Sequence, residues 1–166
     1  MNFENIFTPY KTRKLTEADV PDILGLYLEN AEYFKYCPPS PSRETVKEDL
    51  AALPSEKEAA DKYFIGIFDG NFLVAVMDLI DRYPDDRTDF IGLFMVSKSR
   101  QRKGVGTYIA KALSQALRAE GYRHIRLGYT KTNLSAQSFW HKQGFQPTGA
   151  EFVREHYTVI EAEKRL

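Results

Sequence analysis

The sequence contains a single cysteine, Cys37, among its 166 residues. One cysteine excludes an internal disulfide and a cysteine-based zinc cluster, and we expect no metal site. Long apolar runs are also absent, and none approaches the roughly 20 residues that a membrane-spanning helix needs. Because the start of the chain has no signal-peptide pattern, we expect a cytoplasmic protein that has no membrane partner.

The chain also lacks net charge, because 23 basic residues balance 23 acidic ones. Such a chain has no general attraction for nucleic acid, and we expect no nucleic-acid partner. Internal repeats and low-complexity tracts are missing too. The composition is that of a globular protein, with 43% hydrophobic and 28% charged residues. The length is typical of one domain with its own core, so we expect a single domain over residues 1–166.

One stretch, residues 90–106, combines an apolar run with a basic turn and two glycines. The run 90–96 is typical of a strand, and the turn that follows ends at Gly104 and Gly106. Next comes the apolar spacing of one helix face, carried by Val105, Tyr108, Ile109, Ala112, Leu113, Ala116 and Leu117. The stretch therefore predicts a strand, a basic glycine turn and a helix.

This turn has the properties of an anion site. The first turn of a helix has unpartnered backbone N–H groups at the positive end of the helix dipole. Glycines let a phosphate approach the backbone, because no Cβ is in the way. Arg100, Arg102 and Lys103 add positive charge. We expect a phosphate or pyrophosphate ligand; the alternative is a well-capped helix whose turn happens to be basic.

Two common phosphate motifs do not fit. A P-loop needs a lysine followed by Ser or Thr after its second glycine, whereas here Lys103 precedes Gly104 and Thr107 follows Gly106 directly. The dinucleotide-binding fingerprint needs a third small residue at the position of Ile109.

Two segments instead resemble the GNAT superfamily of N-acetyltransferases. Residues 101–106, Gln-Arg-Lys-Gly-Val-Gly, are similar to its coenzyme A loop, Gln/Arg-x-x-Gly-x-Gly/Ala. Residues 133–145, Asn-Leu-Ser-Ala-Gln-Ser-Phe-Trp-His-Lys-Gln-Gly-Phe, are similar to the family's Asn-x-x-Ala-x-x-Phe-Tyr-x-Lys-x-Gly-Phe segment. Their order and separation make the resemblance specific. It covers residues 90–145, and the earlier part of the chain fits only in its coarse layout.

The resemblance implies acetyl-coenzyme A as the cofactor. The strand end would bind the pantetheine arm, the glycine turn would hold the pyrophosphate, and a strand-end N–H would face the thioester carbonyl. Lys142 could reach a phosphate, or it could simply be solvated. The residues expected to bind the cofactor are Phe94, Met95, Val96, Gln101, Arg102, Lys103, Gly104, Val105, Gly106, Thr107, Asn133, Ala136, Phe139, Trp140 and Lys142.

The implied reaction is acetyl transfer to a primary amine of a small molecule or a peptide. In the family, the first two helices and their connection form one wall of the acceptor site. The residues expected to contact the acceptor are therefore Tyr27, Glu29, Tyr33, Phe34 and Tyr36. For Tyr27 and Phe34 the alternative is packing in the core. A homodimer is also compatible with such folds, although no stretch of sequence identifies an interface.

The predicted catalytic residues are Asp78, Tyr129 and Trp140. Asp78 interrupts an apolar strand, where a carboxylate costs free energy unless it is paired or exposed, and it is our candidate base. Glu29, Asp81 and Asp89 are weaker candidates. Trp140 stands where many family members have a tyrosine acid, and an indole N–H has no usable acidity. Tyr129 is a candidate substitute for that acid.

This departure leaves open an alternative function, a coenzyme A-binding sensor or scaffold that does not catalyse. A third alternative is an unrelated nucleotide-phosphate binder.

The predicted fold is α/β (α+β), a single GNAT-like domain with a central, mixed, mostly antiparallel twisted sheet flanked by helices. A strand–glycine loop–helix–strand unit binds the cofactor. Residues 1–9 are expected to be a loose arm, 10–61 the first strand and acceptor-site helices, and 62–166 the sheet and cofactor-binding core. The expected strands are 10–15, 63–68, 72–80, 89–96, 124–129, 145–148 and 157–160. Helix caps are expected at Thr16, Ser40 and Asn133, and a further helix is expected from Gly104 to Glu120.

Overall fold

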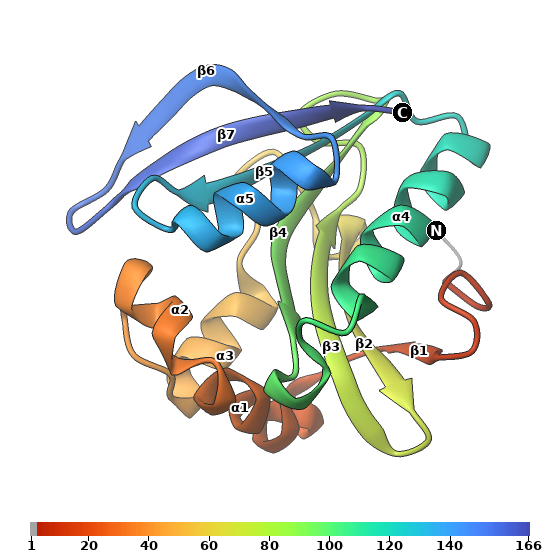
Figure 1. The fold of residues 1–166 in the computed structure, drawn as a ribbon, viewed down its shortest axis with the longest axis vertical. Helices are drawn as coiled ribbons and strands as arrows, with labels where there is room; N and C mark the ends of the chain where they lie inside the picture. The colour runs from red at the N-terminus through yellow and green to blue at the C-terminus, as the bar shows by residue number, and fades with distance from the viewer. Residues whose placement is uncertain (1–2) are drawn as a thin grey trace.

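Seven strands form one sheet in the order β1-β2-β3-β4-β5-β7-β6 (Figure 1). The computed structural model describes residues 3–166. β4 and β5 are parallel and every other neighbouring pair is antiparallel, so the sheet is mixed and mostly antiparallel, as predicted. The strands are β1 (Lys11–Lys14), β2 (Lys62–Asp69), β3 (Phe72–Ile80), β4 (Thr88–Val96), β5 (His124–Thr130), β6 (Gln146–Val153) and β7 (Thr158–Arg165).

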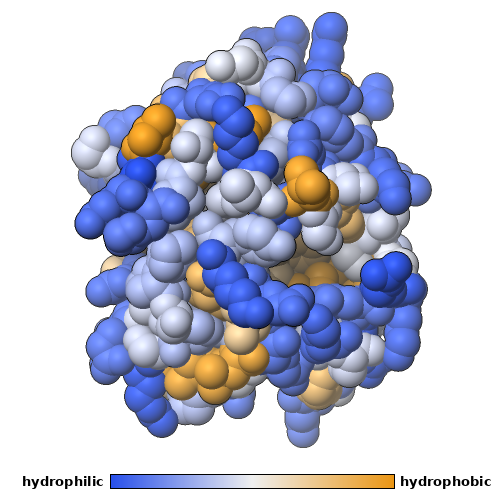
Figure 2. All heavy atoms as spheres, turned by 60° about the vertical axis from the view of Figure 1, so that its left-hand side comes forward, coloured by the Kyte–Doolittle hydropathy of each residue, from blue (hydrophilic) through white to orange (hydrophobic). Residues whose placement is uncertain are grey.

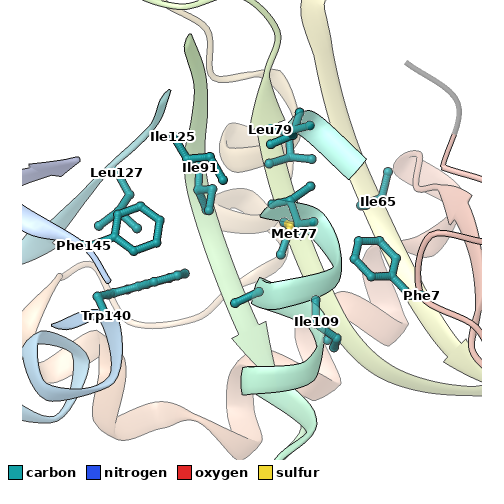
Figure 3. Packing of buried hydrophobic residues seen from close by; sticks show 14 of the residues in the cluster. Phe7, Ile65, Met77, Leu79, Ile91, Ile109, Ile125, Leu127, Trp140 and Phe145 are labelled. Atoms are coloured by element: carbon teal, nitrogen blue, oxygen red, sulfur yellow. The ribbon is translucent and has the colours of Figure 1, made fainter. Parts of the chain in front are cut away.

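Helices cover both faces of this sheet, because alternate strand residues point to opposite faces. Met77 of β3 lies in a large core with α4 and α5, whereas its neighbour Val76 lies in a smaller core with α1 and α3. Figure 3 shows the larger core, in which Ile109 of α4 and Trp140 of α5 face the strand residues. The helices are α1 (Val20–Glu29), α2 (Ala31–Tyr36), α3 (Arg43–Ala51), α4 (Val105–Ala119) and α5 (Leu134–Lys142).

The prediction of a loose N-terminal arm is wrong for residues 3–9. Phe7 is completely buried and Phe3 is 8% exposed, and both belong to the larger core. The hydroxyl of Tyr108 on α4 also donates a hydrogen bond to the carbonyl oxygen of Thr8. The segment therefore packs onto the sheet and α4, because its two phenylalanines gain more from burial than a free arm would gain in entropy.

Two helix boundaries differ from the sequence-based prediction. The aromatic segment after α1 is itself helical, as α2. The cap of α3 is Ser42 rather than Ser40, because a reciprocal capping box needs a side-chain acceptor three residues later. Thr45 supplies it, since its hydroxyl accepts from the Ser42 N–H and its own N–H donates to the Ser42 hydroxyl. Three residues after Ser40 stands Arg43, which has no acceptor.

β4 and β5 separate toward their carboxyl ends. Their pairing runs only from Thr88 opposite His124 to Ile91 opposite Leu127, although β4 continues to Val96. The register between β3 and β4 shifts at the next residue, Gly92, which forms a bulge. A bulge bends its strand and increases the local twist. The far half of β4 therefore keeps β3 as a neighbour and has an unpaired edge toward β5.

The surface carries separate apolar side chains rather than one apolar face in the view of Figure 2. The homodimer therefore remains a prediction. Within residues 3–166, none of the helices has both the length and the apolar character that crossing a bilayer requires. Large apolar side chains that are exposed include Leu28, Tyr36, Phe72, Leu134, Phe152 and Val153.

Asp89, at the start of β4, is a buried carboxyl group without compensation. It is completely buried, and neither of its carboxylate oxygens has a hydrogen-bond partner among the described residues. Burial raises the pKa of Asp89 well above its usual range, and the nearby carboxylates of Asp81 and Glu120 raise it further. At pH values between the unfolded-state and the folded-state pKa of Asp89, the folded protein therefore holds a proton that the unfolded chain has released.

Replacing Asp89 with asparagine tests this account through stability. Because the folded-state pKa is raised, the contribution of Asp89 is greatest below about pH 4 and declines as the pH rises toward that pKa. Relative to D89N, the wild-type free energy of unfolding should fall by up to about 1.4 kcal/mol per pH unit in this window. Urea unfolding between pH 4 and pH 8 measures the difference. Asp86→Asn, in the exposed β3–β4 turn, is the control, and a pH-independent difference for D89N would refute the assignment.

Candidate active site

The two sequence segments that resemble the family meet in space at the first turn of α4. A Cβ added at Gly106 would lie 3.4 Å from Cε2 of Phe139 on α5 and 3.6 Å from Cγ2 of Val96 on β4. The amide of Gln143, which follows α5, donates to the hydroxyl of Thr107 at 3.3 Å. Strand end, glycine turn and α5 thus form one continuous surface beside the opening between β4 and β5.

The glycine turn presents backbone N–H groups. Arg102 and Gly104 have positive φ angles of 57° and 82°, and the space in front of the Gly104 Cα is open. The first bond of α4 runs from the Tyr108 N–H to the Gly104 carbonyl oxygen at 2.9 Å. The N–H groups of Val105, Gly106 and Thr107 therefore have no partner within the helix, and they lie at the positive end of its dipole. This arrangement fits a pyrophosphate.

Gln101, expected to bind the cofactor, is turned inward and holds the turn in place. Its amide nitrogen donates to the Val96 carbonyl oxygen at 2.8 Å and to Oδ1 of Asn30 at 2.6 Å. The Asn30 amide in turn donates to the same Val96 oxygen at 3.2 Å and to the Leu26 carbonyl oxygen at 2.9 Å. Asn30 therefore helps to hold the glycine turn. The sequence does not reveal this role, because an asparagine at a helix end is usually interpreted as a helix cap.

Glu29, expected to contact the acceptor, also faces the basic turn. Its carboxylate accepts from the Ser97 hydroxyl at 3.0 Å and from the Lys98 N–H at 3.1 Å. It does not line the cavity that is described below. Its contacts are therefore those of a residue that ties the end of α1 to the beginning of the turn.

The unpaired edge of β4 carries backbone donors. The Ser97 N–H donates to the Val74 carbonyl oxygen of β3 at 2.8 Å. Because bonding directions alternate along an antiparallel ladder, Met95 bonds to β3, while the N–H groups of Phe94 and Val96 point toward β5. The Met95 side chain lies in the smaller core, on the face of the sheet opposite α4 and α5.

The other predicted cofactor residues surround the same opening. Asn133 caps α5, since its Oδ1 accepts from the Ala136 N–H at 3.0 Å. Arg102 and Lys142 are exposed, and the Lys103 ammonium donates to the Ser99 carbonyl oxygen at 2.9 Å. These positions give the turn an exposed, positively charged rim.

Trp140 is a packing residue in this structure. It is 8% exposed, and its ring centroid lies 4.9 Å from that of Phe139 and 5.0 Å from that of Phe145 (Figure 3). Tyr129 lies on β5 beyond the last pair with β4, and its hydroxyl is buried without a hydrogen-bond partner among the described residues. Burial raises the pKa of Tyr129, so its hydroxyl keeps its proton.

A cavity of about 410 Å³ lies on the opposite face of the sheet, between the sheet, α2 and α3. Of the residues predicted to contact the acceptor, Tyr33 and Phe34 line this cavity, whereas Tyr36 does not. Tyr27 is completely buried, so it belongs to the core and cannot contact a ligand in the cavity. The lining residues are Tyr33, Phe34, Cys37, Pro38, Pro39, Thr45, Glu48, Asp49, Ala52, Leu53, Pro54, Asp78, Ile80, Phe90, Gly92, Leu93 and Tyr157.

Asp78 forms part of the cavity wall and pairs with a buried lysine. Its Oδ2 lies 2.7 Å from the ammonium of Lys62, which also donates to the Ala52 carbonyl oxygen at 2.8 Å. Its Oδ1 is buried and has no partner among the described residues. Burial raises the pKa of Asp78 to about 6 and outweighs the opposing effect of Lys62. The sequence does not reveal Lys62, because a lysine at the start of a strand normally reads as solvated.

The bulge in β4 makes room for this carboxylate. A Cβ at Gly92 would lie 2.7 Å from Oδ2 of Asp78, so a larger residue there would displace this carboxylate from its pair with Lys62. Asp78 therefore lies directly against β4 at the point where β4 leaves β5. Asp78 thus lies on the cavity face of the sheet, next to the strand whose other end borders the opening.

Asp49 is a second cavity carboxylate that sequence reasoning missed. Its Oδ2 accepts from the hydroxyl of the buried Tyr27 at 2.8 Å. Burial raises the pKa of Asp49, while the Tyr27 bond lowers it. The signal was present in the spacing, since Asp49 follows the buried Val46 by three residues and so shares its helix face.

Comparisons of the sequence and the fold with known proteins show to which family the chain belongs. The sequence profile described as "Acetyltransferase (GNAT) family" matches residues 24–145, and no curated protein sequence matches. An acetyltransferase from Thermus thermophilus has a similar structure, with a TM-score of 0.75 and 19% identity over 96% of this chain and 99% of that one.

Two further structures are similar in fold. One, from Salmonella typhimurium, is an acetyl transferase that modifies the N-terminal serine of ribosomal protein L7/L12 (TM-score 0.77, 18% identity, 98% of each chain). The other is the PaiA N-acetyltransferase from Thermoplasma acidophilum in complex with coenzyme A (TM-score 0.67, 16% identity, 96% of this chain and 100% of that one). Because the family profile spans well over half of the sequence, the chain belongs to the GNAT family of N-acetyltransferases, and acetyl-coenzyme A is its cosubstrate.

Proposed function

We propose that this protein transfers the acetyl group of acetyl-coenzyme A directly to a primary amine, with Asp78 as the base. The observation that carries the proposal is the position of Asp78 at the β4 bulge. On one side of β4 lies the cavity that Asp78 lines, and on the other lies the unpaired edge with the Phe94 and Val96 N–H groups. An amine in the cavity and a thioester on the edge would therefore meet at β4.

The cosubstrate would lie along the glycine turn and the β4 edge. The N–H groups of Val105, Gly106 and Thr107 would bind its pyrophosphate, and the edge of β4 would bind its pantetheine arm. The Val96 N–H would donate to the thioester carbonyl oxygen, where negative charge develops during the reaction. Acetyl-coenzyme A supplies the acetyl group as an activated thioester.

The acceptor must lose a proton, because an alkyl amine is almost wholly protonated at neutral pH. With a pKa of about 6, Asp78 is mostly ionised at pH 7 and can accept that proton. The amine nitrogen then forms a bond to the acetyl carbon as the carbon–sulfur bond breaks, and the electron pair of that bond leaves with the sulfur as a thiolate. The nitrogen loses its second proton to this thiolate, directly or through solvent, which gives the neutral amide and the coenzyme A thiol. Tyr129 would donate a hydrogen bond to the leaving sulfur in place of the tyrosine that Trp140 replaces.

Calorimetric titration with acetyl-coenzyme A, with ATP and NAD as controls, tests the cosubstrate site. We expect acetyl-coenzyme A to bind much more tightly than either control. Mass spectrometry of products after incubation with a panel of primary amines then tests transfer. Tight binding without any acetylated product would favour a coenzyme A sensor, and preferential binding of ATP would favour an unrelated nucleotide site.

The cytoplasmic location and the homodimer expected from the sequence remain predictions. Cell fractionation and analytical ultracentrifugation would test them.

A further inference from the structure

The charges that face the cavity have one sign. Among its lining residues are the carboxylates of Glu48, Asp49 and Asp78, and the lining contains no lysine, arginine or histidine. The nearest cation, Lys62, uses its ammonium to bind Asp78 and the Ala52 carbonyl oxygen. The other two carboxylates, those of Asp49 and the exposed Glu48, form no ion pair among the described residues, although the charge of Lys62 also favours the ionised form of Asp49.

Asp78 has an oxygen that lacks a donor. The residue is 7% exposed, and its Oδ1 is buried without a hydrogen-bond partner among the described residues. Buried polar atoms are nearly always satisfied in native proteins, so this Oδ1 is a free acceptor on a residue that lines the cavity. An ammonium or amine N–H would satisfy it.

The other two carboxylates belong to a different wall. Glu48 and Asp49 are carried by α3, whereas Asp78 is on β3 in the sheet. The Tyr27 hydroxyl donates a hydrogen bond to Asp49, which holds its carboxylate in one orientation. A ligand that places one nitrogen at Asp78 can therefore place a second one at α3.

Between these walls the cavity is apolar and aromatic. Tyr33 and Phe34 pack edge to face with their centroids 5.1 Å apart, and further apolar side chains in the lining include those of Leu53, Ile80, Phe90 and Leu93. Such a surface accommodates an alkyl chain, and aromatic faces also attract cations. It offers no cationic partner to a carboxylate or phosphate, and the three acidic side chains would repel either group.

We propose that the acceptor is an aliphatic diamine or polyamine without an anionic group, one nitrogen of which lies at Asp78 and another at Glu48 and Asp49. This inference rests on the proposed function and specifies its acceptor. It excludes free amino acids, which carry a carboxylate beside the reacting amine. It also disfavours simple monoamines, which leave the α3 carboxylates unpaired.

Three acceptors of equal chain length provide the test: 1,4-diaminobutane, butylamine and 4-aminobutyrate. We expect kcat/KM for the diamine to exceed that for butylamine at least tenfold at low salt, and 4-aminobutyrate to be the poorest acceptor. A longer triamine should be acetylated at least as well as the diamine. Glu48→Gln should reduce the ratio of diamine to butylamine several-fold, whereas Glu56→Gln, an equal charge change at an exposed residue outside the cavity, should not.

A second measurement separates this inference from the proposed function. Calorimetry of the coenzyme A-loaded protein with the diamine and with butylamine reports binding without any reaction. Preferential binding of the diamine with no acetylation would support the ligand class and overturn the transferase proposal. Acetylation of butylamine, 4-aminobutyrate or a peptide amine at an efficiency equal to that of the diamine would overturn the ligand class alone. If none of these amines is bound or acetylated, both the ligand class and the transferase proposal are overturned.

Discussion

Replacing Asp78 with asparagine is expected to lower kcat/KM for the amine acceptor by a factor of about 10² to 10⁴, the usual contribution of a general base. Asparagine keeps the shape of the side chain and cannot take a proton. The affinity for acetyl-coenzyme A should stay within about twofold, because the glycine turn lies on the other face of the sheet. Steady-state kinetics and calorimetry measure the two quantities separately.

The D78N variant also leaves the buried Lys62 ammonium without its carboxylate, which costs about 3–5 kcal/mol in comparable pairs. A double variant, Asp78→Asn with Lys62→Met, removes both charges and should recover most of that stability while activity stays lost. If the double variant is folded and retains wild-type kcat/KM, Asp78 is not the base.

The pH profile distinguishes a base from a structural residue. Wild-type kcat/KM should rise with pH around a midpoint near 6, because Asp78 must be ionised and its pKa is about 6. Lys62→Met should move this midpoint to higher pH, since the ammonium is what favours the ionised form. If the midpoint is the same in wild type and Lys62→Met, the rise of kcat/KM with pH reflects the ionisation of another group.

Replacing Gly106 with valine is expected to weaken acetyl-coenzyme A binding by a factor of at least about 100, or about 2.7 kcal/mol. A Cβ there already lies 3.4 Å from Phe139 and 3.6 Å from Val96, so the valine methyl groups must project into the space in front of the turn. They would cover the N–H groups that are proposed to bind the pyrophosphate. Calorimetric titration measures the loss.

Gly25→Val provides the matched control for this substitution. Gly25 also lies within a helix, α1, and a Cβ at that position meets nothing within 4 Å. Both changes replace a helical glycine with a residue of better helix propensity, so neither should unfold its helix. Undiminished acetyl-coenzyme A binding by a folded G106V protein would contradict the placement of the cosubstrate.

The sequence was informative where function depends on local backbone geometry. The glycine turn and the amphipathic pattern of α4 are adjacent in the chain, so their spacing alone predicts a strand, a turn and a helix. The hairpin of β2 and β3 and the parallel pairing of β4 with β5 follow from similar local patterns. The N-terminal arm was mispredicted because the burial of Phe7 depends on α4, about a hundred residues away in sequence.

The cavity that we propose for the acceptor could be foreseen only in part. Tyr33 and Phe34 were identified because an aromatic cluster before two prolines is visible in the sequence, but Tyr27 belongs to the core. Periodicity indicated that Asp78 is unusual in its strand. It could not identify Lys62 as the partner, because Lys62 is sixteen residues away in sequence and pairs with Asp78 from the neighbouring strand. Asp49 becomes significant only beside Tyr27.

The sequence by itself determined the family and the cosubstrate and predicted the glycine turn, because these depend on short motifs whose residues are neighbours in the chain. Only the tertiary structure decided which carboxylates face the cavity, that Glu29 and Gln101 brace the turn, and that Trp140 is packed in the core. The physical reason is that burial and pairing set the pKa and accessibility of a side chain. Both depend on contacts between segments whose sequence separation carries no local signal.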